Sequence, residues 1–188
     1  NFSLLKSVDI EIRKPEAPIE MQFESVSVKI HREWHTAIIA LGSNIGNSRK
    51  YIENAVEQIE NSEYIKDVKV SDLILTKPYG YTEQDDFLNG ALICNTVLSP
   101  NGLLDLMHSI ENRANRIREI HWGPRTLDLD LIFYDDAVID TPDLTVPHID
   151  MHNRAFVLQP VHQIAPYYRH PVLNLTVSQI LERLKQHD

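Results

Sequence analysis

The run LDLDL, residues 127 to 131, alternates strictly between leucine and aspartate. Such alternation is typical of a β-strand, in which successive side chains point to opposite faces. Asp128 and Asp130 should therefore share one face of a sheet, while the leucines and Phe133 share the other. Two neighbouring carboxylates repel each other unless a cation lies between them, and hard divalent cations bind carboxylate oxygens. We interpret the pair as a magnesium site. For a bare D-x-D, a solvated strand face remains the alternative, and the context has to decide.

The composition is that of an ordinary globular protein. The chain has 188 residues, of which 43% are hydrophobic and 24% are charged, so we expect one domain with a short appendage. A formal net charge of -9 argues against a nucleic-acid partner held by broad contacts to phosphates. No apolar run approaches the roughly 20 residues that cross a bilayer, and the first residues do not resemble a signal peptide. We expect a soluble cytoplasmic protein without a membrane partner, with the single cysteine, Cys94, buried.

Periodicity and capping residues predict the order of the elements. They indicate strands at 36–41, from 68 to 77, from 87 onward and across 127–133, helices after 47 and 99, and a C-terminal helix at 177–186. This order is typical of an α+β, ferredoxin-like fold, in which a four-stranded antiparallel sheet carries its helices on one face. We add a C-terminal helical extension and extra N-terminal strands. The second face of the sheet is expected to be uncovered.

The strand that begins at Phe87 predicts which residues reach that uncovered face. Leu88, Leu92 and Cys94 should face the helices, so Phe87, Asn89 and Ala91 should point away from them. Phe87 and Asn89 can then share one surface with Asp128 and Asp130. A flat heterocycle could stack on the ring of Phe87 while the amide of Asn89 reads its edge. In general, however, aromatic residues such as Phe87, Trp122 and Phe156 are more often core residues.

Cationic and imidazole side chains gather in a chain that is acidic overall. Between residues 116 and 154 they are Arg116, Arg118, His121, Arg125, His148, His152 and Arg154. Local positive charge beside a carboxylate pair suits a nucleoside triphosphate, because Mg²⁺ bridges carboxylates and phosphate oxygens while arginines bind the remaining oxygens. Ordinary surface salt bridges are the alternative for each arginine taken alone. His148 could be a loop residue or a phosphate donor.

Four segments together resemble a known enzyme family. ALGSNIGN, FLNGAL, RIREIHWGPRTLDLDLIFYDD and LTVPHIDMHNRAFVLQP look like 6-hydroxymethyl-7,8-dihydropterin pyrophosphokinase, over about residues 34 to 188. The joint motif WGPRTLDLDL plus TVPHxDMxNR is far more specific than a D-x-D. The resemblance implies transfer of pyrophosphate from ATP to the pterin hydroxymethyl group in folate biosynthesis, with two Mg²⁺ ions and with ATP bound before the pterin.

The resemblance also implies a role for each matched residue. Asp128 and Asp130 would hold the metal ions, and Arg116 and Arg125 would act with them in catalysis. The ATP phosphates would be bound by Arg116, Arg118, Arg125, His148 and Arg154. The pterin would be bound by Phe87, Asn89, Trp122 and Phe156. The sequence departs from the family at Ile149, where a tyrosine is common, and at His108, where glutamine is expected. These two departures affect local contacts and not the chemistry.

Residues 1 to 33 resemble the final strands of a second enzyme of the pathway, dihydroneopterin aldolase. Lys14 matches a lysine that this family uses in catalysis, but the rest of that active site is missing. We therefore expect no aldolase activity from this chain, and a parent polypeptide in which an oligomeric aldolase domain is fused to the pyrophosphokinase domain of residues 34 to 188. An unrelated N-terminal extension that forms a hairpin is the alternative.

Two other functions fit parts of the pattern. A metal-dependent phosphohydrolase could use the same D-x-D, and it would release inorganic phosphate or ADP where a pyrophosphokinase releases AMP. A non-catalytic ferredoxin-like module could bind RNA on an open sheet with exposed aromatics, although such modules usually have a basic surface.

Overall fold

A computed structural model describes residues 5–14, 26–78, 83–114 and 124–186 of the chain. The chain divides into two compact units, Asn1–Trp34 and His35–Asp188. In the part that the structure describes, no helix is both long and apolar enough to span a membrane.

The first unit contains an antiparallel ribbon of two strands, β1 (Ser7–Lys14) and β2 (Val26–Glu33). Ile10 pairs with Ile30 and Ile12 pairs with Val28, so these apolar side chains share one face of the ribbon. All four are exposed. Asp9 pairs with His31 on the opposite face, where their side chains are 2.8 Å apart. The ribbon therefore has one apolar face and one charged face.

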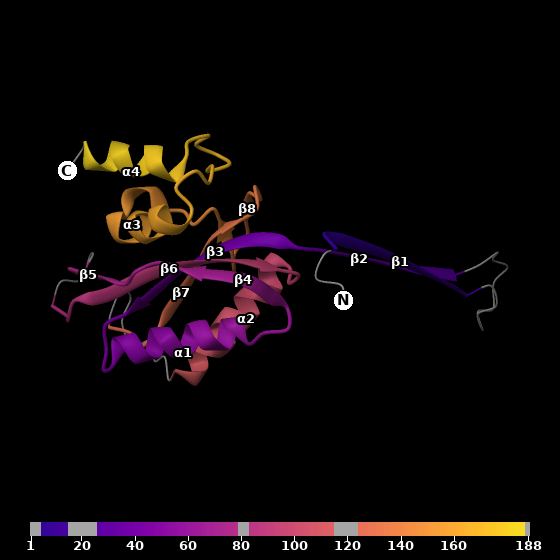
Figure 1. Ribbon diagram of the computed structural model, residues 1–188, viewed down its shortest axis with the longest axis horizontal. Coiled ribbons are helices and arrows are strands. Elements are labelled where there is room, and N and C mark those ends of the chain that lie inside the picture. Colours follow the sequence, from indigo (N-terminus) through magenta and orange to yellow (C-terminus); the bar gives the residue numbers. More distant parts are fainter. Residues whose placement is uncertain (1–4, 15–25, 79–82, 115–123, 187–188) are drawn as a thin grey trace. The chain divides into compact units, whose positions relative to one another are not determined.

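The second unit is built around a mixed α/β arrangement with an antiparallel sheet. Its described strands are β3 (His35–Ser43), β4 (Ile65–Val70), β5 (Ile74–Thr76), β6 (Phe87–Thr96) and β7 (Asp128–Tyr134). They follow the order β4-β6-β3-β7, and β5 pairs with the other end of β6 (Figure 1). The central strands β3 and β6 are thus covered at both edges. A separate short ribbon is formed by β8 (Ile139–Asp140) and β9 (Thr145–Val146).

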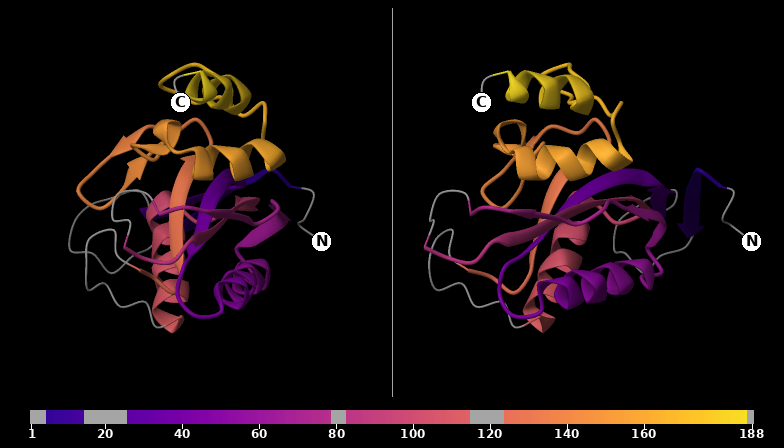
Figure 2. Two further views of the ribbon diagram at one scale, coloured as in Figure 1. Left: turned by 90° about the vertical axis from the view of Figure 1, so that its left-hand side faces the viewer. Right: turned by 60° about the vertical axis from the view of Figure 1, so that its left-hand side comes forward.

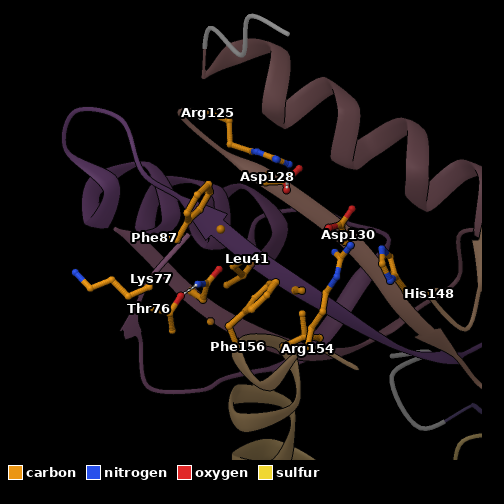
Figure 3. A pocket seen from close by; sticks show the side chains of 15 residues that line it. Leu41, Thr76, Lys77, Phe87, Arg125, Asp128, Asp130, His148, Arg154 and Phe156 are labelled. Carbon is orange, nitrogen blue, oxygen red and sulfur yellow. Dashed lines mark hydrogen bonds and ion pairs between the residues drawn. The ribbon is translucent and has the colours of Figure 1, made fainter. Parts of the chain in front are cut away.

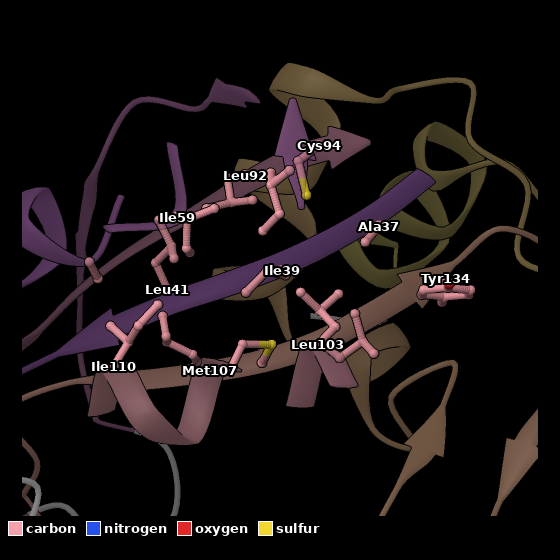
Figure 4. Close-up of a cluster of buried hydrophobic side chains, with 14 of the residues drawn as sticks. Ala37, Ile39, Leu41, Ile59, Leu92, Cys94, Leu103, Met107, Ile110 and Tyr134 are labelled. Atoms are coloured by element: carbon pink, nitrogen blue, oxygen red, sulfur yellow. The ribbon is translucent and has the colours of Figure 1, made fainter. Parts of the chain in front are cut away.

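Helices α1 (Ser48–Glu60) and α2 (Pro100–Arg113) cover one face of the sheet (Figure 1). Both begin at the predicted caps, since Asn47 accepts the Lys50 N–H and Ser99 accepts the Gly102 N–H. Their apolar stripes meet alternate residues of β3, β6 and β7 in a closed core (Figure 4). Cys94 lies in this core, and burial raises the pKa of its thiol to about 12. The prediction of a buried cysteine is confirmed.

The other face of the sheet is not uncovered, and here the sequence-based prediction is wrong. Helix α3 (Ala155–Ile164) packs on β3 and β6, and α4 (Val177–Lys185) packs on α3 (Figure 2). The short 3-10 helix η1 (Met151–Asn153) precedes α3. The apolar side chains of Ile38 and Ile132 point to this face and require a cover. The C-terminal helix was predicted, but α3 was missed because prolines punctuate its region and Pro160 lies inside it.

A β-bulge in β7 corrects a second prediction. Ile38 of β3 pairs with Phe133, whereas Ile39 pairs with Leu131, so Ile132 is the extra residue. The alternation of β7 shifts at this point. Phe133 therefore lies on the face of Asp128 and Asp130, in the core under α3, and not with the leucines as we predicted.

The strand predicted from residue 68 to 77 is two strands, β4 and β5. Between them, Ser71 is bound to Ala91 of β6 through its side chain as well as its backbone. The Ser71 hydroxyl accepts the Ala91 N–H, and the backbone N–H of Ser71 donates to the Ala91 carbonyl, both at 2.9 Å. Gly90 leaves room for Leu73, whose side chain would lie 2.6 Å from a Cβ at that position. The chain therefore leaves the sheet at residue 71 and returns at Ile74.

Candidate active site

A pocket opens on the α3 side of the sheet, at the end where β3 finishes. Its floor includes the row Asn89–Gly42–Asp128 across the sheet, and Ala40 and Asp130 of the next row. The middle strand contributes only Gly42 and Ala40 to these rows. A Cβ at Gly42 would lie 3.3 Å from Oδ1 of Asn89, so a side chain there would crowd the amide. Small residues at the centre, with Asn89, Asp128 and Asp130 beside them, leave room for a cavity in this part of the sheet.

Asp128 and Asp130 line the same wall of the pocket, as the alternation of β7 predicted (Figure 3). Asp128 accepts a hydrogen bond from Nη1 of Arg125 at 2.5 Å, and both side chains are mostly buried. Between the two aspartates, Leu129 points to the opposite face, and its N–H donates to the buried carboxylate of Glu111 on α2 at 2.8 Å. Glu111 therefore anchors β7 from below, midway between the two acids of the pocket.

The donor set of this wall suits a hard cation in part. The two carboxylates supply oxygen ligands, while the described residues contain no group of three or more His, Cys, Asp and Glu side chains that could hold a metal ion. Mg²⁺ is commonly bound by one or two carboxylates, with waters and phosphate oxygens completing its six ligands. The pair therefore fits a Mg²⁺ ion that binds together with a phosphate ligand better than an ion bound by protein alone.

A second cationic group lines the pocket beside Asp130. Figure 3 shows Arg154 extending toward Asp130 and His148. Nε of Arg154 donates to Asp150 at 2.8 Å, and the amide of Asn153 together with this guanidinium lowers the pKa of the Asp150 carboxyl. The guanidinium also lies 5.9 Å from the ring centre of Phe156. Arg154 is therefore held at the border between the acidic and the aromatic parts of the pocket.

His148 is held as a neutral donor. The backbone N–H of His148 donates to the Ile132 carbonyl. Nδ1 of its ring lies 3.3 Å from the backbone nitrogen of Asp150 and can accept that N–H only when Nδ1 is unprotonated. In neutral imidazole the proton is then on Nε2. Burial, with a smaller effect of the positive charge of Arg154, lowers the pKa of His148 below its ordinary value. The side chain can donate one hydrogen bond from Nε2 without adding a second charge.

The opposite side of the pocket is aromatic and amide-bearing. Phe87 comes from β6 and Phe156 from α3, and Figure 3 shows their rings on either side of the cavity. Between them, Nδ2 of the buried Asn89 donates to the Thr76 hydroxyl at 2.7 Å. Arg125 lies 5.8 Å from the ring centre of Phe87, so the two sides of the pocket meet at this arginine.

Most of the predicted site residues that the structure describes meet in this pocket. They are Phe87, Asn89, Arg125, Asp128, Asp130, His148, Arg154 and Phe156. Arg116, Arg118, His121 and Trp122 lie outside the described residues. His152 does not line the pocket and instead contacts the neighbouring Asn153. Of the two departures from the family pattern, Ile149 is 74% exposed and follows the pocket residue His148 in the sequence, and His108 is exposed on α2.

Sequence reasoning missed several residues that shape the site. Gly42, Thr76 and Lys77 line the pocket, and Glu111 anchors β7. Gly42 directly follows the strand predicted at 36–41, and Thr76 and Lys77 end the strand predicted from 68 to 77, so none of the three was assigned a role in the site. The sequence offered one signal for Glu111, which is an acidic residue immediately after the apolar Ile110. In the structure only 2% of its surface is exposed.

Comparison with known proteins identifies the family. The model of the family "7,8-dihydro-6-hydroxymethylpterin-pyrophosphokinase (HPPK)" matches residues 38–166, which is more than half of the chain. The chain belongs to this pyrophosphokinase family. The match does not extend to residues 1–33, so it does not test the aldolase resemblance of that segment.

Relatives of this pyrophosphokinase domain occur both alone and within longer proteins. The chain is 41% identical over 133 residues to a 2-amino-4-hydroxy-6-hydroxymethyldihydropteridine pyrophosphokinase of Pseudomonas aeruginosa, covering 71% of this chain and 82% of that protein. It is 42% identical over 129 residues to the bifunctional protein FolKE of Lactococcus lactis, and this match covers 69% of this chain but only 37% of the relative. The chain thus spans little more than a third of that longer protein.

The fold agrees with this family. A crystal structure of wild-type HPPK-DHPS from Plasmodium falciparum superimposes with a TM-score of 0.63 at 16% identity, over 81% of this chain and 45% of that one. At this identity the likeness concerns the fold alone.

Proposed function

We propose that this chain transfers pyrophosphate from ATP to the hydroxymethyl group of 6-hydroxymethyl-7,8-dihydropterin, giving AMP and the pterin diphosphate, as a step of folate biosynthesis. Membership of the pyrophosphokinase family supports this proposal. The observation that carries it is the division of one pocket into two parts. Two carboxylates and two arginines line one part, while two aromatic rings and a buried amide line the other.

The acidic and cationic part suits the triphosphate. When bound, two Mg²⁺ ions held by Asp128 and Asp130 would neutralise phosphate charge. Arg125 and Arg154 would bind phosphate oxygens, and the uncharged imidazole of His148 would donate one hydrogen bond to a phosphate from Nε2. Arg125 would have to exchange part of its contact with Asp128 for phosphate oxygens. Arg116 and Arg118, outside the described residues, keep their predicted role at the ATP phosphates.

The aromatic part suits the pterin. A flat ring between Phe87 and Phe156 would bury both of its faces, and the Asn89 amide would bind its edge. Thr76 accepts one N–H of this amide, so the amide oxygen and the second N–H remain to bind the pterin. Trp122, also outside the described residues, keeps its predicted place in this subsite.

These two subsites would bring the reacting groups together without a covalent intermediate. The pterin hydroxyl oxygen attacks the β-phosphorus of ATP in line, the bond between the α,β-bridging oxygen and the β-phosphorus breaks, and AMP leaves. The protein contributes position and charge neutralisation, which together account for most of catalysis in phosphoryl transfer. We assign no residue to the removal of the hydroxyl proton.

Product identity tests the proposal. The chain should be supplied with ATP, Mg²⁺ and the pterin, and its products separated by chromatography. We expect AMP and pterin diphosphate in equal amounts, and no AMP when the pterin is omitted. Release of ADP or inorganic phosphate in place of AMP would support a phosphohydrolase instead. In a calorimetric titration, we expect the pterin to bind only after Mg²⁺ and a non-hydrolysable ATP analogue.

The strand order further supports a ferredoxin-like plan as a finer description of the fold. The strands β3, β4, β6 and β7 occur in the sequence order β-α-β-β-α-β with α1 and α2, and the first strand lies between the third and the fourth. Helices α3 and α4 are then additions that convert the second sheet face into the wall of a pocket.

We also propose that residues 1 to 33 are the end of an aldolase-like domain in a bifunctional parent protein. Besides the resemblance, the exposed apolar face of the β1–β2 ribbon supports this, because such a face normally packs against further structure. Lys14 is exposed at the end of β1. We expect no aldolase activity from this chain and aldolase activity from the longer gene product. Both activities would be those of a cytoplasmic folate pathway.

A further inference from the structure

Three separate segments of the chain meet at one buried side chain, Asn44, in the turn after β3. Only 4% of Asn44 is exposed. Its Oδ1 accepts the N–H of Arg125 at 2.8 Å. Its Nδ2 donates to Oε1 of Gln84 at 3.0 Å and to the carbonyl of Asp85 at 3.1 Å. A backbone bond adds to these, since the Asn44 N–H donates to the Arg125 carbonyl at 3.1 Å.

The orientation of this amide follows from its partners. A backbone N–H can only donate and a backbone carbonyl can only accept, so the oxygen must face Arg125 and the nitrogen must face Asp85. Both N–H groups and the oxygen of the amide are then used. Only the longer glutamine has the same amide group, with two N–H donors and an oxygen acceptor.

Each of the two segments held by Asn44 leads into a different part of the pocket. Arg125 contacts Asp128 at 2.5 Å on the acidic side. Asp85 lies two residues before Phe87, which lines the aromatic side, and Arg125 in turn lies over the Phe87 ring. Asn44 itself does not line the pocket. It is therefore placed to hold the two substrate subsites at a fixed separation without touching either substrate.

We infer that Asn44 is a positioning residue that couples the nucleotide subsite to the pterin subsite through Arg125 and the Gln84–Asp85 segment. This inference rests on the proposed function. Loss of a buried hydrogen bond that leaves its partner unsatisfied costs enough to change an equilibrium constant about 10-fold. Asn44 should therefore affect how strongly a bound nucleotide promotes pterin binding, beyond any effect on stability.

Two substitutions separate the two arms of the contact. Asn44→Asp keeps an oxygen that accepts the Arg125 N–H but loses the donors to Gln84 and Asp85. We expect its affinity for a Mg²⁺-bound non-hydrolysable ATP analogue to change less than about 2-fold, while pterin affinity in the presence of that analogue falls about 10-fold. Asn44→Leu loses both arms, so both affinities should fall and the promotion of pterin binding by nucleotide should be lost.

Asn47→Ala is the matched control. Asn47 lies in the same turn, is exposed, and accepts the Lys50 N–H as the N-cap of α1. Its replacement removes one hydrogen bond from this turn, but neither arm of the coupling. We expect lower stability with unchanged affinities for both ligands.

Calorimetric binding constants, kcat and KM of the three variants decide the matter, together with amide hydrogen exchange at Arg125. Faster exchange at Arg125 in Asn44→Leu but not in Asn44→Asp, with the affinities above, supports the inference. Equal affinity losses in Asn44→Asp and Asn44→Leu, or losses that Asn47→Ala reproduces, would overturn it. If the unsubstituted chain forms no AMP while Arg125 exchange changes as expected, the proposed function fails and the positioning contact stands.

Discussion

At the scale of single residues, the two aspartates of β7 have unequal surroundings. Asp128 is bound to Arg125, whereas Asp130 lies beside Arg154 and His148 in the pocket. The backbone N–H of Leu129, which lies between them in the sequence, donates to the carboxylate of Glu111 on the opposite face of the sheet. The acid pair is therefore held on a strand that Glu111 anchors from the opposite face of the sheet.

Replacement of Asp130 by Ala should abolish transfer without unfolding the domain. We expect AMP formation to fall by about 1,000-fold or more, since charge stabilisation inside such a site contributes several kcal/mol. The like charge of Asp128 and the nearby cation Arg154 oppose each other at this half-buried carboxylate, so its net contribution to folding is small and the denaturation midpoint should barely change. Asp140→Ala, which removes an exposed acid of β8, is the control. Undiminished AMP formation by Asp130→Ala would refute the metal assignment.

Replacement of Phe87 by Ala should weaken pterin binding selectively. Aromatic stacking contributes about 1–3 kcal/mol for a nucleic-acid base, so we expect pterin affinity to fall about 10- to 100-fold. Affinity for the ATP analogue should change far less, and calorimetry measures both. Leu75→Ala on the neighbouring β5 removes an apolar side chain that is 68% exposed, and it serves as the control. Equal losses for both ligands would show that Phe87 acts as a core residue.

At the scale of elements, the cover that α3 and α4 place on the sheet decides where the pocket lies. The connection between these helices is fixed by His170, which is 5% exposed and packs edge-on against Phe133 of β7. Its Nδ1 accepts the N–H groups of Val172 and Leu173, both at 3.2 Å. An imidazole that accepts two hydrogen bonds at Nδ1 must be unprotonated there.

Stability should therefore fall in mild acid. Burial, with a smaller effect of His152, lowers the pKa of His170 below its ordinary value of 6.5. His170 then binds a proton more readily in the unfolded chain than in the folded protein. The stability that neutral His170 contributes is therefore fully present above about pH 6.5, and it is lost as the pH falls through the lower pKa of the folded state. Denaturation midpoints measured from pH 7.5 to 5 should show this decrease. His148 has a pKa lowered in the same direction and contributes similarly.

The variant His170→Gln tests this assignment. It removes the group that titrates, so the unfolding free energy should depend less on pH than in the unsubstituted protein, with the slope due to His148 remaining. His162→Gln removes another histidine, on α3, and is the control. An unchanged pH slope in His170→Gln would show that the connection between α3 and α4 does not sense pH.

At the scale of the whole molecule, the two units differ in what stabilises them. Residues 35–188 enclose hydrophobic clusters on both faces of the sheet. The described ribbon of the first unit instead exposes the apolar face that carries Ile10, Ile12, Val28 and Ile30. A two-stranded ribbon is marginally stable by itself in water, and exposed apolar patches promote association.

Charges on that face should reduce self-association without affecting catalysis. We expect the double substitution Ile12→Lys and Val28→Lys to lower the apparent mass in light scattering at high protein concentration, while kcat and KM stay unchanged. Glu11→Gln and Lys29→Gln on the charged face provide the control, since these residues pair across the ribbon on its other side. Loss of activity in the Lys variant would show that the ribbon contributes to the pyrophosphokinase site.

The sequence by itself determined the local features of this protein. Alternation in LDLDL placed Asp128 and Asp130 on one face, Asn47 and Ser99 marked the starts of α1 and α2, and the linked motifs indicated the family. The shared face of the two aspartates and the helix starts depend on residues close in the chain, where backbone geometry and capping act directly. The same alternation placed Phe87 and Asn89 on the pocket side of β6.

Only the tertiary structure decided what lies around those features. α3 covers the face that was expected to be open, the bulge at Ile132 turns Phe133 under that cover, and Glu111 binds β7 from the opposite face. Asn44 meets Arg125 across 81 positions of the chain. Such contacts follow from how the layers pack and close over one another, and no local periodicity encodes which distant partner a polar side chain will find.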